Sequence, residues 1–348
     1  MGEENGANGG AVHFNMRRRR CSQLEGNVWS GGVTLLDAQT SEQLCELQLE
    51  TGVAALAWCS SDGNVLALGC DDGDVRLAKL SADEALIFKP LSGSNDDKDT
   101  VTDWGHDDVI TDVSSSITEK THLATCSWDL TVKLWDVTVM DQTIATFHGH
   151  TDLIWGVAMN PTHKHVLCSA SQDSTVQVWD ARQSQGAALS ILTLSPALSV
   201  DWHPRQPVIF SVGLDDGRVC TYDVRSPHMP LAQHDTHTAA VHVVRYSPYH
   251  DDVLATGGDD GKAFVTESCS KNDCNAREVL GGDNLSAHRD YVRAFDWCQL
   301  MSSSLTSQTD TILFTGSWDK TVHKWNIDDY FCDEQVLDTT SGKQSLNN

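Results

Sequence analysis

The sequence is short of positive charge. It holds 24 lysine and arginine residues against 49 aspartate and glutamate residues, which gives a net charge of −25. Proteins that bind nucleic acid directly need a basic surface to neutralise phosphates, so this balance argues against that function. The same charge would attract cationic partners, such as arginine-rich protein tails. Plain solubility explains the charge equally well.

Long apolar runs are missing too. No stretch of 18 or more apolar residues occurs, so we expect no transmembrane helix and no membrane partner. The opening segment "MGEENGANGGAVHFNMRRRR" has no apolar core of a secretory signal. The 11 cysteines include no C-x-x-C pair. Scattered cysteines of odd number favour free thiols in a reducing compartment over a disulfide framework.

Signatures of common enzymes and cofactor sites are also absent from the sequence. It contains no P-loop, no G-x-S-x-G and no dinucleotide-binding fingerprint. Its histidines and cysteines do not fall at convincing metal-ligand spacings. We therefore expect no catalytic residues, no metal and no cofactor.

A repeated segment runs through the chain. Strings such as "SWDLTVKLWD", "SQDSTVQVWD" and "SWDKTVHKWN" place an aspartate in a turn ahead of a β-branched strand. The turn aspartates are Asp72, Asp129, Asp173, Asp216, Asp260 and Asp319. From Asp129 to Asp260 they recur every 43 or 44 residues. The last step, to Asp319, is 59 residues, and eight of its extra residues fit a longer loop at 300–308.

A histidine keeps phase with this aspartate in four copies. It precedes the aspartate by 23 residues in three copies and by 31 in the last. We predict structural hydrogen bonds within the pairs His106–Asp129, His150–Asp173, His237–Asp260 and His288–Asp319. A catalytic group occurs once in a chain, whereas these pairs occur four times. Their repetition therefore favours a role in the scaffold.

The period of about 44 residues predicts the fold class. Four short strands per period within a G-H…W-D frame are typical of a WD-repeat β-propeller. We predict an all-β propeller of seven blades, each with four antiparallel strands, over residues 25–330. Six repeats lie near 52–80, 105–137, 149–182, 195–225, 236–268 and 287–327.

An open ring of blades would expose sheet edges, so a seventh blade should close it. The segment "VWSGGVTLLD" (28–37) aligns with the strand that follows the turn aspartate in other copies. We therefore expect residues from about 12 to 49 to form the closing blade. Residues 1–24 are expected to be a partly disordered arm, and residues 331–348 a C-terminal tail. The arginines at 17–20 fit either a nuclear-import element or a solvated arm.

Tryptophan precedes the turn position in three copies, where other copies have polar residues. These tryptophans are Trp29, Trp128 and Trp318. Tryptophan at a turn tip is typical of an interface anchor. The alternative is that each ring lies flat over a neighbouring loop.

The strand entry after each histidine supplies a second set of candidate partner contacts. Strand alternation places the third and fifth residues after the histidine on one side and the residue between them in the core. In the last copy these residues are Tyr291 and Arg293, on either side of Val292. Trp155 holds the fifth place in an earlier copy. We predict that Tyr291, Arg293, Trp155 and Trp318 bind a partner, because these residue types dominate binding hot spots.

The charges of the last copy have a competing explanation. Arg289 or Arg293 could form a salt bridge within its own blade, with Asp290 or Asp296. Such a pair would be structural, and the arginine would then not be available to bind a partner.

Several segments resemble one known family. They are "AHRDYVRAFDW" (287–297), "TGVAALAW" (51–58), "GHDDVITDV" (105–113), "SVDWHP" (199–204) and "VWSGGVTLLD". Over about residues 26–327 the chain is similar to the WD-repeat subunit of the methylosome, the partner of the type II protein arginine methyltransferase. The resemblance implies a non-catalytic adaptor in a hetero-octamer of four enzyme and four adaptor subunits. Such an adaptor helps present arginine-rich spliceosomal Sm-type tails and histone tails for symmetric dimethylation.

The resemblance also implies contact residues and a location. In the family, a first-blade tryptophan inserts into the barrel domain of the enzyme, and Trp29 matches it. A family phenylalanine ahead of the last-blade motif also contacts the enzyme; here Leu285 is the apolar residue nearby. The family implies a protein of the cytoplasm and the nucleus.

Two other functions stay open. The motif "WDAR" (179–182) matches the pattern of substrate receptors of cullin-type ubiquitin ligases. A propeller enzyme would need a unique constellation of reactive side chains, and the sequence shows none.

Overall fold

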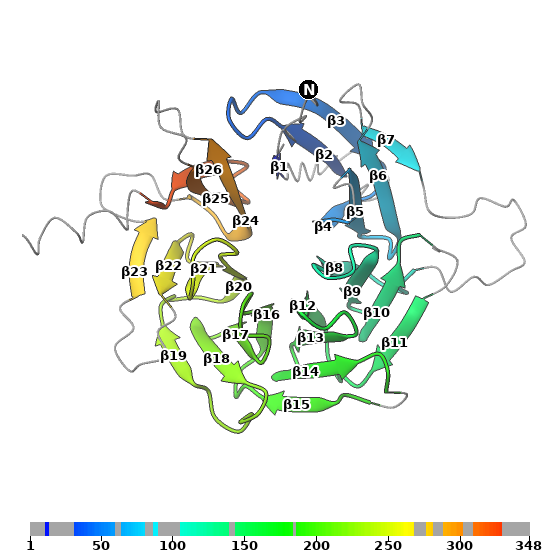
Figure 1. Cartoon of the computed structure of the whole chain (residues 1–348), viewed down its shortest axis with the longest axis vertical. Helices are drawn as coiled ribbons and strands as arrows, with labels where there is room; N and C mark the ends of the chain where they lie inside the picture. The colour runs from blue at the N-terminus through cyan, green and yellow to red at the C-terminus, as the bar shows by residue number, and fades with distance from the viewer. Residues whose placement is uncertain are drawn as a thin grey trace, which may run out of the picture.

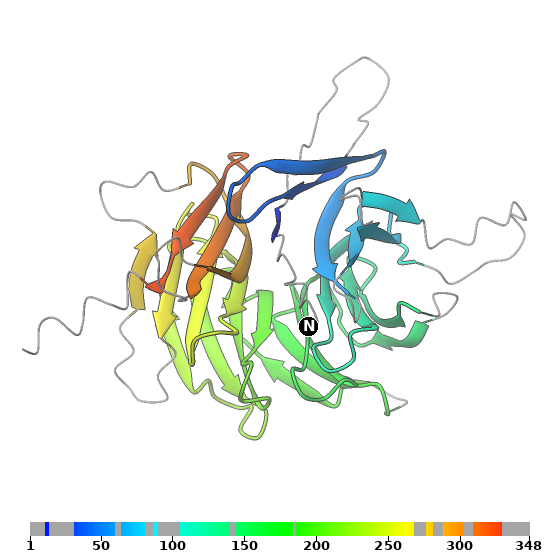
Figure 2. The same ribbon diagram turned by 45° about the horizontal axis from the view of Figure 1, so that its top comes forward.

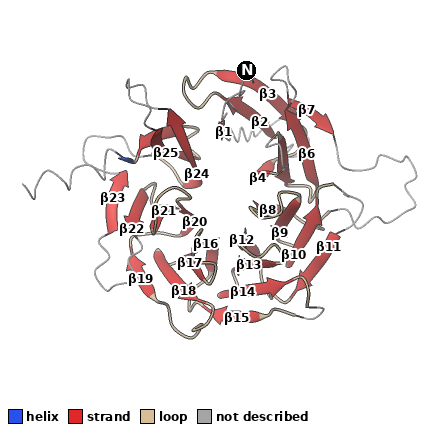
Figure 3. Cartoon of the chain, in the orientation of Figure 1, coloured by secondary structure: helices blue, strands red, loops and turns tan. Residues whose placement is uncertain are grey.

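The computed structural model describes residues 31–59, 64–80, 105–138, 143–183, 186–267, 288–301 and 309–328, together with the backbone of 11–13, 86–89 and 276–280. The regular elements within these ranges are strands (Figure 3). Most of the predicted arm and the whole predicted tail lie outside the described ranges.

The described strands form seven antiparallel sheets. The first sheet consists of β1 (Ala11–His13), β2 (Gly31–Leu36) and β3 (Gln43–Leu49). The second consists of β4 (Val53–Trp58), β5 (Val65–Cys70), β6 (Val75–Leu80) and β7 (Leu86–Lys89). The third consists of β8 (Ile110–Ser115), β9 (His122–Ser127), β10 (Thr131–Asp136) and β11 (Thr143–His148).

Four further sheets follow in chain order. They are β12 (Ile154–Met159), β13 (Val166–Ser171), β14 (Thr175–Asp180) and β15 (Leu189–Leu192); then β16 (Ala197–Trp202), β17 (Ile209–Leu214), β18 (Arg218–Asp223) and β19 (Ala232–Asp235). Next come β20 (Val241–Tyr246), β21 (Val253–Gly258), β22 (Ala263–Glu267) and β23 (Ala276–Leu280). The last described sheet contains β24 (Val292–Met301), β25 (Thr309–Ser317) and β26 (Val322–Asn326).

The sheets stand around a common axis as the blades of a propeller (Figure 1). Strands β4, β8, β12, β16, β20 and β24 are the innermost of their blades, and each chain segment then steps outward. Neighbouring blades pack face to face through apolar side chains. Trp202 and Phe210 of one blade, for example, share a buried cluster with Val176 and Ile191 of the blade before it. The hydrophobic core therefore lies between the blades, because alternating strand residues point at both neighbours.

The sheet β1–β3 lies between the two ends of the repeat array (Figure 2). On one side, Val33 and Leu35 of β2 pack against the β4–β7 blade. On the other side, Ala38 packs against Phe314 of β25, and the Nζ atom of Lys324 donates to the Ala38 carbonyl at 3.0 Å. These contacts join the N-terminal sheet to both the first and the last repeat.

In four blades a buried hydrogen-bonded chain ties the loops to the strands. In the β8–β11 blade, His106 Nδ1 lies 2.8 Å from Asp129 Oδ2, and Nε2 lies 2.7 Å from the Thr125 hydroxyl. The same hydroxyl accepts from Trp135 Nε1 at 2.9 Å. Burial would raise the pKa of Asp129, but hydrogen bonds from His106 and Thr131 and the His106 charge outweigh it and hold that pKa well below its usual range.

The other three predicted pairs are also hydrogen-bonded. Two of these pairs belong to complete hydrogen-bonded series. The first joins His150 and Asp173 to Ser169 and Trp179. The second joins His288 and Asp319 to Thr315 and Trp325. His237 binds Asp260 and Thr256, but Thr266 stands where the other copies have tryptophan. The hydroxyl residue went unnoticed in the sequence, although it lies four positions before the turn aspartate each time.

Candidate protein-binding site at the channel mouth

Every inner strand of the six repeats carries a β-bulge near its start. In β24 the register shifts between Val292 and Ala294, so that Arg293 is the extra residue. The same shift occurs in the other inner strands. The bulge residues are Ala54, Thr111, Trp155, Leu198, His242 and Arg293. A bulge re-aims one side chain of a strand, so each blade contributes one such residue.

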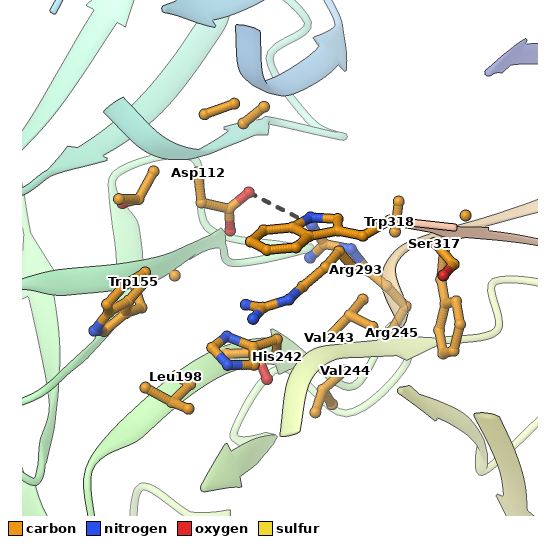
Figure 4. Close-up of a pocket in the computed structure, with 18 of the residues that line it drawn as sticks. Asp112, Trp155, Leu198, His242, Val243, Val244, Arg245, Arg293, Ser317 and Trp318 are labelled. Atoms are coloured by element: carbon orange, nitrogen blue, oxygen red, sulfur yellow. Dashed lines mark ion pairs between the residues drawn. The ribbon is translucent and has the colours of Figure 1, made fainter. Parts of the chain in front are cut away.

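All six bulge residues line one cavity of about 330 Å³, on the axis of the ring. Figure 4 shows this cavity, with Trp155 and Leu198 on one side and Arg293 and Trp318 across from them. We call the six bulge residues and the cavity that they line the channel mouth. Each repeat contributes one bulge residue to the lining, beside other residues such as Asp112, Arg245 and Trp318.

The bulge position is readable from the sequence. It is always the fifth residue after the repeat histidine or after Leu49 and Thr193, which replace that histidine in two copies. The rule that selects Trp155 and Arg293 in the sequence also selects Thr111 and His242, which follow a repeat histidine. It does not select Ala54 and Leu198, whose copies lack that histidine. The missing signal was that the same position of all copies converges on one axis.

Tyr291, Arg293 and Trp318 form one cluster at the channel mouth. The Arg293 guanidinium carbon lies 5.3 Å from the centre of the Tyr291 ring and 5.1 Å from that of Trp318. The two rings are 5.3 Å apart, and the Trp318 backbone N–H donates to the Tyr291 carbonyl at 3.0 Å. Tyr291 is 37% exposed and Trp318 is 44% exposed. The structure therefore brings these three predicted residues together and leaves both rings accessible.

The Arg293 guanidinium makes an ion pair between blades. Its Nη2 atom lies 2.9 Å from Asp259 Oδ1, in the β21–β22 turn of the preceding blade. The competing explanation, a salt bridge with Asp290 or Asp296 of its own blade, is wrong for Arg293. Arg289 uses its backbone N–H, which donates to Asp319 at 2.9 Å.

His242 lies on the other side of Asp259. Its Nε2 atom is 3.3 Å from Asp259 Oδ2. Burial, and secondarily the charge of Arg293, lower the pKa of His242 to about 3. At neutral pH the imidazole is therefore uncharged, and Arg293 carries the positive charge of this trio.

Trp155 and Trp128 support each other away from that cluster. Their rings meet edge to face with centres 5.5 Å apart, and Trp155 Nε1 donates to Gln172 at 3.0 Å. Trp128 is half-buried and meets Trp155 at 75°, so its ring does not lie flat on that neighbour. Its contact with a partner stays a prediction. Trp29 and Leu285, the other two predicted contacts, lie outside the described residues.

Arg245 forms the floor of the channel mouth. It lies 3.7 Å from Asp112 of another blade (Figure 4) and also feels the charges of Asp201 and Asp296. Asp112 and Asp201 each accept a backbone N–H from the next blade, Val157 at 3.1 Å and Tyr246 at 2.8 Å. These carboxylates therefore join inner strands as well as surround the guanidinium.

Two carboxylates that act on Arg245 titrate abnormally. Burial raises the pKa of Asp201 to about 6, against the opposing effect of Arg245 and two backbone hydrogen bonds. Burial likewise raises the pKa of Asp296 to about 6. Both groups are ionised at neutral pH, so the negative charge around Arg245 exceeds its own positive charge.

Arg182 of the "WDAR" motif is exposed on the rim of its blade. Its Nε and Nη2 atoms bind both carboxylate oxygens of Asp180, at 2.9 and 2.6 Å. Arg225 binds Asp223 in the same way in the next blade. The local ion pair fixes the arginine but leaves it accessible.

Neither a metal centre nor a membrane-spanning helix emerges from the described part of the chain. Within it, no three His, Cys, Asp or Glu side chains are grouped so as to hold a metal ion. No helix there has the length and apolar character needed to cross a bilayer.

Comparison with known proteins agrees with the repeat structure. The family model "WD domain, G-beta repeat" matches residues 98–136, 141–180 and 282–326. Methylosome protein WDR77 of Xenopus laevis is 26% identical over 298 residues, covering 82% of this chain and 81% of that protein. The peroxisomal targeting signal 2 receptor of Schizosaccharomyces pombe is 22% identical, over 82% of this chain and 83% of that protein. With its blades and their hydrogen-bonded clusters, the chain is an all-β WD-repeat propeller, a fold typical of protein-interaction scaffolds.

Proposed function

We propose that this protein is a non-catalytic adaptor for a type II protein arginine methyltransferase. It would bind the enzyme and help present arginine-rich tails, such as spliceosomal Sm-type and histone tails, for symmetric dimethylation. The observation that carries the proposal is the similarity to a methylosome protein along most of both chains. The resemblance of "AHRDYVRAFDW" to that family's last blade supports it.

The surface of the protein suits this role. The net charge of −25 would draw cationic tails to it. The exposed Tyr291 and Trp318 rings with Arg293 have the composition of a binding hot spot. The four repeated histidine–aspartate pairs occupy the same place in their blades, which supports a role in the scaffold and not in catalysis. In this role the adaptor would belong to a hetero-octamer and act in the cytoplasm and the nucleus.

Co-purification tests the proposal. The full chain, tagged and isolated from its own cells, should bring down an arginine methyltransferase in stoichiometric amount. Trp29→Ala should abolish that association while the circular dichroism spectrum stays unchanged, because an anchor residue contributes to binding and not to the core. Unchanged association of the variant would remove Trp29 from the enzyme interface.

The alternative function is that of a ubiquitin-ligase substrate receptor. The exposed Arg182 of "WDAR" is the observation that favours it. The same purification decides between the two functions. Recovery of a cullin-ligase adaptor that is lost in Arg182→Ala, with no methyltransferase present, would overturn the methylosome proposal.

A further inference from the structure

The channel mouth has the shape of a side-chain pocket. Trp155 and Trp318 lie on opposite sides of the cavity (Figure 4), and Asp112 and Arg245 also line it. Ala54 and Thr111, the smallest bulge residues, line the cavity as well and do not fill it. A volume of about 330 Å³ accommodates a long side chain and part of the backbone that carries it.

The charges around the cavity favour a cation. Three cationic side chains line it: Arg245, Arg293 and Lys320. Two carboxylates line it, Asp112 and Asp290. Three more act on the lining arginines: Asp201 and Asp296 act on Arg245, and Asp259 pairs with Arg293. His242 is uncharged at neutral pH because its pKa is about 3. Five carboxylates against three cations leave a small excess of negative charge around the cavity.

Arg293 shows which cation the surface recognises. Its guanidinium rests near two aromatic rings, Tyr291 and Trp318, and binds one carboxylate, Asp259. Guanidinium groups are planar and weakly hydrated, so they stack on aromatic faces and bind carboxylates better than ammonium groups do. The protein thus uses its own arginine in the arrangement that a second arginine would need.

We propose that the channel mouth binds an arginine side chain of an extended partner peptide, between Trp155 and Trp318 and next to Asp290 and Asp112. This assignment rests on the proposed function in one respect: arginine-rich tails are the substrates that such an adaptor would present. It goes further in placing the tail on the axis of the ring and not at its rim.

The test uses the full chain and synthetic peptides. A Gly/Ser peptide with spaced arginines is titrated while tryptophan fluorescence and the heat of binding are recorded. The same peptide with lysine should bind about tenfold more weakly, because an ammonium group loses the stacking. The peptides with citrulline or glutamate should show no measurable binding. Equal binding of the lysine peptide, or binding of the glutamate peptide, would overturn the proposal.

The chain offers a matched pair of aspartates for mutation. Asp290 and Asp152 occupy the same place in their repeats. Each accepts the N–H of the next residue at 2.8 Å, and each backbone carbonyl accepts a serine hydroxyl, Ser317 for Asp290 and Ser171 for Asp152. Only Asp290 lines the cavity. Asp290→Asn should weaken arginine-peptide binding several-fold, whereas Asp152→Asn should leave it unchanged.

Trp318→Ala supplies the second variant. The ring is 44% exposed, so its removal should leave the melting temperature nearly unchanged. It should lower the affinity for the arginine peptide by about tenfold or more. If both cavity variants bind the arginine peptide as the unaltered chain does, the assignment is wrong.

Co-purification of the methyltransferase is scored separately. Enzyme binding without peptide binding would defeat this inference alone, and peptide binding without the enzyme would defeat the proposed function alone.

Discussion

Arg293 and Asp259 form an ion pair of 2.9 Å across the boundary between two blades. Arg293 is the bulge residue of β24, and Asp259 belongs to the β21–β22 turn. The pair holds a guanidinium beside two accessible aromatic rings and an uncharged imidazole. The channel mouth is therefore organised before any partner arrives, which lowers the entropic cost of binding.

Replacing Arg293 should change the titration of His242. Burial is the larger cause of the low pKa of His242, and the Arg293 charge adds to it. Arg293→Met removes the charge, so the pKa should rise from about 3 but stay below 6.5, because burial persists. Nuclear magnetic resonance of the imidazole protons against pH measures it. Arg218→Met, whose arginine pairs with Asp216 in its own turn, is the control and should leave the value unchanged.

The hydroxyl in each hydrogen-bonded chain should matter more where it serves two partners. Thr125→Val leaves both His106 Nε2 and Trp135 Nε1 buried without their partner, which should cost about 2–4 kcal/mol of unfolding free energy. Thr256→Val removes the hydroxyl partner of His237 alone, so it should cost about half as much unfolding free energy. Denaturant unfolding of the two variants compares them. Equal losses would show that the tryptophan bond contributes nothing.

Asp129 should stabilise the fold only above strongly acidic pH. Its folded pKa lies below the value of an unfolded aspartate, so its contribution is complete above about pH 4 and is lost as pH falls towards the folded pKa. Asp129→Asn should therefore destabilise the protein at pH 7 and have a smaller effect as pH falls below 4. Unfolding free energies at several pH values provide the check. A destabilisation that is constant over that range would contradict the ionic role of Asp129.

Asp201 should behave in the opposite way. Its folded pKa of about 6 exceeds the unfolded value of 3.8, so its favourable contribution is complete below the unfolded pKa and disappears as pH rises to about 6. Asp201→Asn keeps an acceptor for the Tyr246 N–H and abolishes the titration. Relative to the unaltered chain, the variant should gain stability between pH 4 and 7, on the order of 1–2 kcal/mol. No relative gain would mean that Arg245 neutralises Asp201 fully.

The repeat spacing predicts the architecture well because each copy repeats the same local physics. The 23-residue offset places His106 opposite Asp129, and the structure joins them at 2.8 Å. The predicted all-β propeller is confirmed. The alternation around Val292 is seen too: Val292 is buried and Tyr291 and Arg293 are not.

Relations between blades could not be predicted in this way. Arg293 has several aspartates nearby in sequence, and it pairs with Asp259, 34 positions away, because the ring brings the preceding turn to it. The hydrophobic pattern of a strand does not mark its bulge either, because the extra residue can be of any type. The cavity that the bulge residues share forms only once the blades stand around one axis.

Reconstitution of methylation tests the adaptor function most directly. The methyltransferase partner is assayed on an arginine-rich tail alone, with the unaltered chain and with Trp318→Ala, and the chain is also assayed without enzyme. We expect no turnover by the chain, a higher kcat/KM of the enzyme when the chain is present, and a raised KM with unchanged kcat for the variant. Turnover by the isolated chain, or an enzyme whose kcat/KM is indifferent to the chain, would contradict the account.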